Sequence, residues 1–278
     1  MLNLQEEINS FLFYLENVRA YAPSSIVTYK NILDELSELA HYYIEEETII
    51  LDISPLRLKN VKNAKKTISK KLSAIRSLVK YMQEQQGTKV KVIGDSVIKV
   101  PKTLPKPIEQ NLIEEILRCS NHKEHLIISL LYGLGLRISE LSTLKLSNIS
   151  KEWIEVRGKG NKTRQIPLIP SLFEKIKNYV EQENPKVFLF EKDNQAMNSS
   201  QIRYLFTKVF KKSGIKATPH QLRHSFATHL LHNGARISDV SELLGHSSMV
   251  STQIYTALGS SKKLNEYAKA HPLCVNNK

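Results

Sequence analysis

Apolar side chains recur every three or four positions in three stretches of the first 84 residues, the pattern of helices with one buried face. Two helices are expected over residues 4–18 and 24–43, separated by Ala22-Pro23-Ser24-Ser25, which supplies a turn and an N-cap. A third is expected around residues 62–80, with a buried stripe formed by Ile68, Leu72, Ile75, Val79 and Met82. Residues 1–84 are therefore predicted to form a small helical domain.

The helical spacing stops over residues 85–107, where two glycines and three prolines predict an extended, basic linker. Two short apolar runs further on, 153–156 and 164–168, flank a Gly-Lys-Gly-Asn-Lys-Thr turn and predict a β-hairpin. Helical spacing covers residues 108–120, 123–134, 170–182, 198–213, 219–233, 238–244 and 250–258. The fold class is therefore mainly α, with a second, α-rich domain over residues 108–278 that contains one small antiparallel sheet.

The composition excludes two broad classes of protein. Of the 278 residues 41% are hydrophobic and 24% charged, which is typical of a globular chain and not of a disordered one. No apolar run approaches the roughly 20 residues that span a bilayer, and the acidic N-terminus lacks the basic flank of a secretory signal. Cys119 and Cys274 are too few for a disulfide framework, so we expect reduced thiols in a cytoplasmic protein.

The distribution of charge is more informative than its total. The formal net charge is +13, which makes polyanions the default partner. Residues 1–50 are acidic, whereas residues 62–80 carry seven Lys or Arg and no Asp or Glu. This helix lacks the i,i+4 counter-charges that a merely solvated helix usually carries. Its basic faces are therefore either a contact surface for a nucleic-acid backbone or an ordinary solvated surface.

Two basic residues of the second domain are not explained by core packing. Arg137 stands between apolar segments, directly after a helix that breaks at two glycines, so it is expected to pair with Glu140 or to bind an anion. Lys159 lies at the tip of the predicted hairpin, where it is either a surface lysine or a group that reaches into a groove. The Gly-x4-Gly-Lys-Ser/Thr spacing is absent around it, which excludes a nucleotide-binding P-loop.

Two further places hold histidines. Thr218 and Pro219 predict the start of a helix, and His220 and Arg223 lie on its first turn, where free N–H groups favour an anion. A zinc site at His220 and His224 lacks the Glu of the His-Glu-x-x-His pattern and a third ligand. His246 follows a glycine at a helix end, so it is either part of a functional site or a simple C-cap residue. Tyr255 comes nine residues later.

Together these residues could surround a phosphate, with two arginines, two histidines, one lysine and a hydroxyl nucleophile. No carboxylate cluster accompanies them, which argues against a two-metal nuclease. In order and spacing the set closely resembles the tyrosine site-specific recombinases, in particular the Xer subfamily. The resemblance rests on Gly-Leu-Arg-Ile-Ser-Glu-Leu at 135–141, Lys159, His220-x-x-Arg223, Leu-Gly-His at 244–246 and Tyr255. It covers essentially the whole chain, more loosely in the helical N-terminal domain.

The resemblance implies a role for each site residue. Arg137 and Arg223 would bind the non-bridging phosphate oxygens, and His246 would add a hydrogen bond. Tyr255 would attack the phosphorus, giving a 3′-phosphotyrosyl link and a free 5′-hydroxyl.

Proton transfer would fall to two other residues. His220 would accept the tyrosine proton, and Lys159 would protonate the leaving 5′-oxygen. Glu140 would orient a neighbouring side chain. No metal, ATP or other cofactor would be needed, because the covalent link conserves the energy of the phosphodiester.

The resemblance also implies an architecture and partners. The two domains would form a C-shaped clamp on a double-stranded recombination site, with a SAM-like core-binding domain at the N-terminus. The terminal stretch, residues 262–273, would dock into a neighbouring subunit within a four-subunit synapse. A septal DNA translocase is an expected activator, and chromosome dimer resolution at cell division an expected role. The alternatives are an integrase of a phage or conjugative element, a type IB topoisomerase and a non-catalytic DNA-binding protein.

Overall fold

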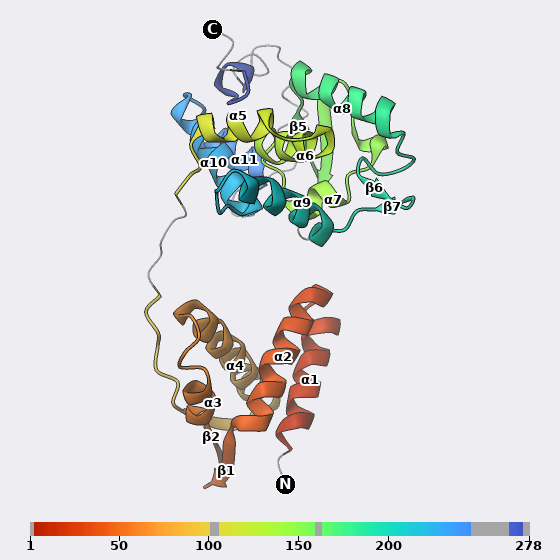
Figure 1. The fold of residues 1–278 in the computed structure, drawn as a ribbon. Coiled ribbons are helices and arrows are strands. Elements are labelled where there is room, and N and C mark those ends of the chain that lie inside the picture. Colours follow the sequence, from red (N-terminus) through yellow and green to blue (C-terminus); the bar gives the residue numbers. More distant parts are fainter. Residues whose placement is uncertain (1–2, 101–105, 159–162, 246–266, 275–278) are drawn as a thin grey trace. The chain divides into compact units, whose positions relative to one another are not determined.

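The computed structural model describes residues 3–100, 106–158, 163–245 and 267–274 (Figure 1). The chain divides into two compact units, Met1–Thr103 and Leu104–Lys278, and each has its own buried apolar core. In the part of the chain that is described, no helix is both long and apolar enough to cross a membrane. Cys119 and Cys274 are free cysteines.

Four helices supply most of the first unit. They are α1 (Leu4–Asn17), α2 (Pro23–Leu39), α3 (Ser54–Lys59) and α4 (Lys65–Gln86). Helix α4 packs against α1 and α2, and the apolar stripe predicted for it is confirmed, because all five of its residues are buried. The helix ends at Gln86, and Gly87 caps it in a left-handed conformation (φ +67°), which is a usual way to stop a helix.

A three-stranded sheet in the first unit corrects the prediction of a purely helical domain. It consists of β1 (His41–Glu45), β2 (Thr48–Asp52) and β3 (Lys89–Ile93), in that order, with β1 antiparallel and β3 parallel to β2. The second predicted helix therefore ends at Leu39, and part of the predicted linker is a strand. The physical reason is local: β-branched and aromatic residues dominate β1 and β2, and β3 alternates lysine with valine.

Three basic side chains of the 62–80 segment form ion pairs in the structure, two of them with acids that are distant in the sequence. Lys71 pairs with Glu35 of α2 and also donates to Asn60. Arg76 lies 2.7 Å from Asp95, and Lys80 lies 3.5 Å from Glu84. The other four basic residues are exposed, and the described residues offer them no ion pair. They are Lys62, Lys65, Lys66 and Lys70.

The second unit is built around a buried helix, α6 (His122–Gly133), which packs against α8, α9 and α10. Its other helices are α5 (Gln110–Arg118), α7 (Ile138–Ser142), α8 (Pro170–Glu183), α9 (Ser199–Lys212), α10 (Pro219–His232) and α11 (Ile237–Leu244), with a 3-10 turn η1 (Leu146–Asn148). The predicted hairpin is confirmed as β4 (Trp153–Arg157) and β5 (Thr163–Pro167). The sequence did not predict the second ribbon, β6 (Glu191–Lys192) with β7 (Gln195–Ala196).

The described part of the C-terminal stretch, residues 267–274, packs on its own unit. His271 is fully buried, and its Nε2 lies 2.6 Å from the carbonyl oxygen of Gly133 at the end of α6. Because that carbonyl can only accept, Nε2 carries the proton, and Nδ1 accepts from the backbone N–H of Leu273. Gln110 and Asn233 donate to the carbonyl oxygens of Pro272 and Ala270. Docking of this stretch into a neighbouring subunit stays a prediction.

His271 is expected to make the stability of the second unit depend on pH. Burial lowers its pKa to about 4, against the raising effect of the bond to Gly133. A folded-state pKa below that of the unfolded chain, about 6.5, means that stability is complete above pH 6.5 and falls toward pH 4. At pH 5 the expected loss in the free energy of unfolding is about 2 kcal/mol.

Urea unfolding at pH 7.5 and pH 5.0 checks this expectation. The matched variant is His271→Gln, which keeps an N–H donor for Gly133 but cannot titrate. The wild type should lose about 2 kcal/mol more than the variant between the two pH values. An equal loss in the two proteins would mean that other groups carry the pH dependence.

Candidate active site

Arg137 is placed by the break between α6 and α7. Gly135 turns the chain there with φ +58°, and a Cβ at this position would lie 2.5 Å from the ring of Phe226. Arg137 then serves as the N-cap residue of α7. Its backbone N–H donates to Oε2 of Glu140, and its Nη1 donates to Oε1, both at 2.8 Å. The ion pair that the sequence left as an alternative is therefore present, although the Arg137 side chain stays 36% exposed.

Gly135 is expected to tolerate no side chain. Gly135→Ala adds left-handed strain and a clash with Phe226, and overpacking costs about 1–3 kcal/mol. Gly214→Ala is the matched control, because Gly214 also has positive φ (+71°) but nothing within 4 Å of an added Cβ. In urea unfolding, Gly135→Ala should lose about 2 kcal/mol more than Gly214→Ala. Equal losses would show that the backbone, and not the contact with Phe226, sets the requirement.

Arg223 enters the site from α10. This helix begins as predicted, with the Thr218 side chain accepting from the N–H of Gln221 and proline in the first turn. Arg223 is only 4% exposed. Its Nη1 donates to the carbonyl oxygen of Gly135, and its Nη2 donates to that of Leu244, the last residue of α11. One guanidinium therefore ties together the turn before Arg137 and the end of α11.

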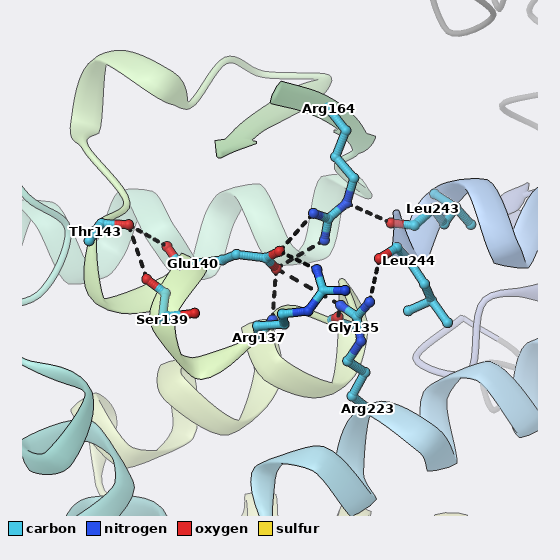
Figure 2. A network of polar contacts seen from close by, with 9 residues as sticks. All are labelled: Gly135, Arg137, Ser139, Glu140, Thr143, Arg164, Arg223, Leu243 and Leu244. Carbon is cyan, nitrogen blue, oxygen red and sulfur yellow. Dashed lines mark hydrogen bonds and ion pairs between the residues drawn. The ribbon is translucent and has the colours of Figure 1, made fainter. Parts of the chain in front are cut away.

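Glu140 is the anion at the centre of this cluster (Figure 2). Its side chain is 2% exposed, and guanidinium groups from α7, α10 and β5 surround it. Burial alone would raise the pKa of Glu140, but the hydrogen bonds and charge of Arg164, followed by the hydrogen bonds from Arg137, lower it below its ordinary value. The carboxylate is therefore charged at neutral pH. It acts on Arg137 as expected, by holding that side chain through a charged hydrogen bond.

Arg164 is the residue that the sequence analysis missed. It lies on β5, and its Nη1 and Nη2 donate to the two oxygens of Glu140 at 2.7 and 2.9 Å. The available signal was strand alternation, because Arg164 shares a face with the fully buried Ile166. A charged residue at such a position needs a partner inside the protein.

The cluster carries excess positive charge. Three guanidinium groups face one carboxylate, which leaves a net charge of +2. Burial lowers the pKa of Arg223 to about 9, with a further lowering from Arg137 and a raising effect from Glu140. At pH 7 Arg223 is still protonated. Such a buried surplus of forked N–H donors suits a phosphodiester, which carries one negative charge and two non-bridging oxygens.

His220 lies one helical turn before Arg223 on α10, as predicted, and is exposed. The structure gives it no hydrogen bond to another described residue. His224 follows on the same helix, but the described residues contain no group of three or more His, Cys, Asp or Glu that could hold a metal ion. Within the described ranges, His220 and His224 therefore have no third ligand for a zinc ion.

Lys159, His246 and Tyr255 lie outside the described residues, but the elements that lead to them are described. Strands β4 and β5 flank the turn that contains Lys159. Helix α11 ends at Leu244, and Gly245, with φ +63°, caps it directly before His246. The hairpin is therefore bonded to the cluster through Arg164, and the end of α11 is bonded to it through the carbonyl of Leu244.

The second unit is α-rich, and its cationic site lies at the junction of α7, α10 and β5. Residues 105–262 match the model of the phage integrase family, and residues 8–86 match that of the phage integrase N-terminal SAM-like domain. The chain belongs to the tyrosine recombinase family of DNA breaking and rejoining enzymes, as a member of the Xer type. The resemblance stated from the sequence is confirmed.

Individual relatives agree with this assignment. Tyrosine recombinase XerC of Bacillus pumilus is 31% identical over 299 residues, which cover 98% of both chains. Tyrosine recombinase XerA of Pyrococcus furiosus is 40% identical over 189 residues, and the match spans 64% of this chain and 66% of that relative. The post-cleavage crystal structure of XerH recombinase bound to palindromic difH substrate has a TM-score of 0.68 at 20% identity, with 94% and 84% of the chains covered. At that identity it supports the fold alone.

Proposed function

We propose that this protein cuts and rejoins double-stranded DNA at a specific site through a 3′-phosphotyrosyl intermediate. The observation that carries the proposal is the buried cluster around Glu140, in which Arg137 and Arg223 keep N–H donors beyond those bonded within the described residues. The two arginines bind the non-bridging oxygens of the scissile phosphate. They stabilise the charge that grows on those oxygens as the phosphorus becomes pentacoordinate.

The bond changes follow from this binding. The phenolic oxygen of Tyr255 attacks the phosphorus while the bond to the 5′-oxygen breaks, and His220 takes the phenolic proton. Lys159 gives a proton to the 5′-oxygen, and His246 adds a hydrogen bond to the phosphate. An unperturbed tyrosine is about 0.1% ionised at pH 7, a deficit of roughly 4 kcal/mol, which a base and a cationic field can offset. Rejoining reverses these steps with a 5′-hydroxyl as the nucleophile.

The first unit supplies sequence-independent affinity. Lys65 and Lys66 occupy the first turn of α4, where the helix dipole disfavours cations, and Lys62 and Lys70 flank them. Four exposed lysines beside free backbone N–H groups fit the phosphates of a DNA strand. Each phosphate contact releases counterions, so binding should weaken steeply with added salt.

The biological role that we propose is resolution of chromosome dimers before cell division. Its support is the similarity to XerC over nearly the whole of both chains. Two sites with two half-sites each require four subunits in the synapse, with the C-terminal stretch docking in trans. Recombination of a supercoiled two-site plasmid, with and without the septal translocase domain, tests the activator. Equal yields with and without the translocase domain would refute its role as an activator. Preferential insertion into foreign sites would favour a mobile-element integrase.

The central test is a nicked suicide duplex that carries the candidate site. The full chain is incubated with it in EDTA, and the products are run on a denaturing gel. We expect a covalent protein–DNA adduct that Tyr255→Phe abolishes while salt-sensitive DNA binding persists. An adduct that survives Tyr255→Phe would move the nucleophile elsewhere. Binding without any adduct, even with the translocase domain added, would leave a non-catalytic DNA-binding protein.

A further inference from the structure

The side chain of Arg164 donates three hydrogen bonds within the cluster. It forms a two-pronged pair with Glu140, with both carboxylate oxygens engaged, and its Nε donates to the carbonyl oxygen of Leu243 at 2.9 Å. Its side chain is only 12% exposed. One residue of β5 therefore holds the start of α7 and the end of α11 at the same time (Figure 2).

We propose that Arg164 is a positioning residue for the phosphate-binding arginines. It acts through Glu140 and α11, and it does not touch the phosphate. The inference rests on the proposed function, because it takes Arg137 and Arg223 as the groups that bind the scissile phosphate. In this role Arg164 keeps the N–H donors of Arg137 and Arg223 available for the phosphate.

The three arginines compete for the carboxylate of Glu140. Glu140 can accept a forked, two-bond contact from one guanidinium, and Arg164 occupies that geometry. Arg137 is left with a single side-chain bond at 2.8 Å, and Nη1 of Arg223 remains 3.9 Å away. Without Arg164, a neighbouring arginine could take the forked position. Its donors would then point at Glu140 and be lost to the phosphate.

Arg164 also holds the C-terminal end of α11. Arg164 donates to the carbonyl of Leu243, and Arg223 donates to that of Leu244, so two cations hold consecutive carbonyls at the C-terminal end of one helix. Cations are favoured there by the helix dipole. Loss of Arg164 would leave Arg223 to hold the end of α11 alone. This end leads directly to His246 and onward to Tyr255.

The test compares two substrates in single-turnover cleavage by the full chain. One suicide duplex has the natural scissile phosphodiester, and the other has a neutral methylphosphonate at that position, which needs less cationic stabilisation. We expect Arg164→Met to slow adduct formation on the phosphodiester by about tenfold or more, with DNA affinity almost unchanged. On the methylphosphonate the slowing should shrink to about threefold or less, and Arg164→Lys should lie between wild type and Arg164→Met.

Arg157→Met is the matched control. Arg157 lies on β4 of the same hairpin, is exposed, and has no polar side-chain contact among the described residues. Its cleavage rates should equal those of the wild type on both substrates. An Arg164→Met protein that cleaves at the wild-type rate, or that slows equally on the two substrates, overturns the inference. If Arg164→Met does not fold, the same ratio measured with Arg164→Lys decides.

These outcomes are separable from failure of the proposed function. Wild-type protein that forms no Tyr255-dependent adduct on either substrate would refute tyrosine transesterification, and the inference would fall with it. If the wild type cleaves and the Arg164 variants are slowed equally on the two substrates, the inference about Arg164 is refuted and the proposed function stands.

Discussion

Replacing Arg223 with lysine is expected to slow adduct formation by a factor of about 10² to 10³, the usual cost of losing one donor aimed at transition-state charge. Lysine keeps the positive charge but has no planar fork. It cannot hold the carbonyls of Gly135 and Leu244 and also present two N–H groups to a phosphate. Single-turnover cleavage of the nicked duplex measures this rate, and a binding titration on the same duplex measures affinity.

The split between rate and affinity is the informative result. Arg223 is buried, and one arginine contributes little to a DNA affinity set by many phosphate contacts, so the dissociation constant should change only a few-fold. Arg203→Lys, on the exposed face of α9, provides the control for a conservative change in the same unit. A rate for Arg223→Lys within about threefold of the wild type would contradict the assignment of Arg223 to the phosphate.

Glu140→Gln is expected to lower the free energy of unfolding by about 3–5 kcal/mol, because removal of one partner leaves buried charges uncompensated. Glutamine keeps an acceptor for the N–H of Arg137, so the start of α7 is preserved. What is lost is the negative charge between Arg137, Arg164 and Arg223. Urea unfolding at pH 7.5 measures the change.

Glu124→Gln isolates the effect of the three arginines. Glu124 is as buried as Glu140 and caps the start of α6 in the same way, by accepting from the N–H of Asn121. Among the described residues its one ionic partner is Lys208, at 3.4 Å and partly exposed. This variant should lose no more than about 1 kcal/mol. Equal losses at the two positions would mean that burial of a carboxylate, and not the arginine cluster, accounts for the effect.

Much of this site could be predicted from the sequence, because it is built from local signals. The break at Gly135 predicts where Arg137 lies, and Thr218 with Pro219 predicts the first turn that carries Arg223. The β4–β5 hairpin follows from two short apolar runs around a glycine-rich turn. In each case the residue that fixes the backbone stands within a few positions of the functional side chain.

The remainder depends on contacts between distant segments. Strand β3 pairs in parallel with β2, although all of α4 lies between them in the sequence. Two lysines that alternate with two valines, followed by Ile93, did not by themselves indicate a partner strand. Lys71 finds Glu35 on another helix, so the absence of acids within 62–80 overstated the free positive charge. Arg164 of β5 contacts both Glu140 of α7 and the carbonyl of Leu243 in α11, and because these segments are distant in the sequence, no local pattern indicates that link.

The two carbonyls at the end of α11 have a thermodynamic consequence. The same guanidinium of Arg223 that is proposed to bind the scissile phosphate also anchors Leu244. If Arg223 binds the scissile phosphate as proposed, occupancy of the phosphate site and the position of this helix end are linked equilibria, and linkage is reciprocal. A contact that fixes the end of α11 where Arg223 keeps its other N–H donors free would then raise the affinity for the scissile phosphate. Bound phosphate would favour that position of the helix end by the same free energy.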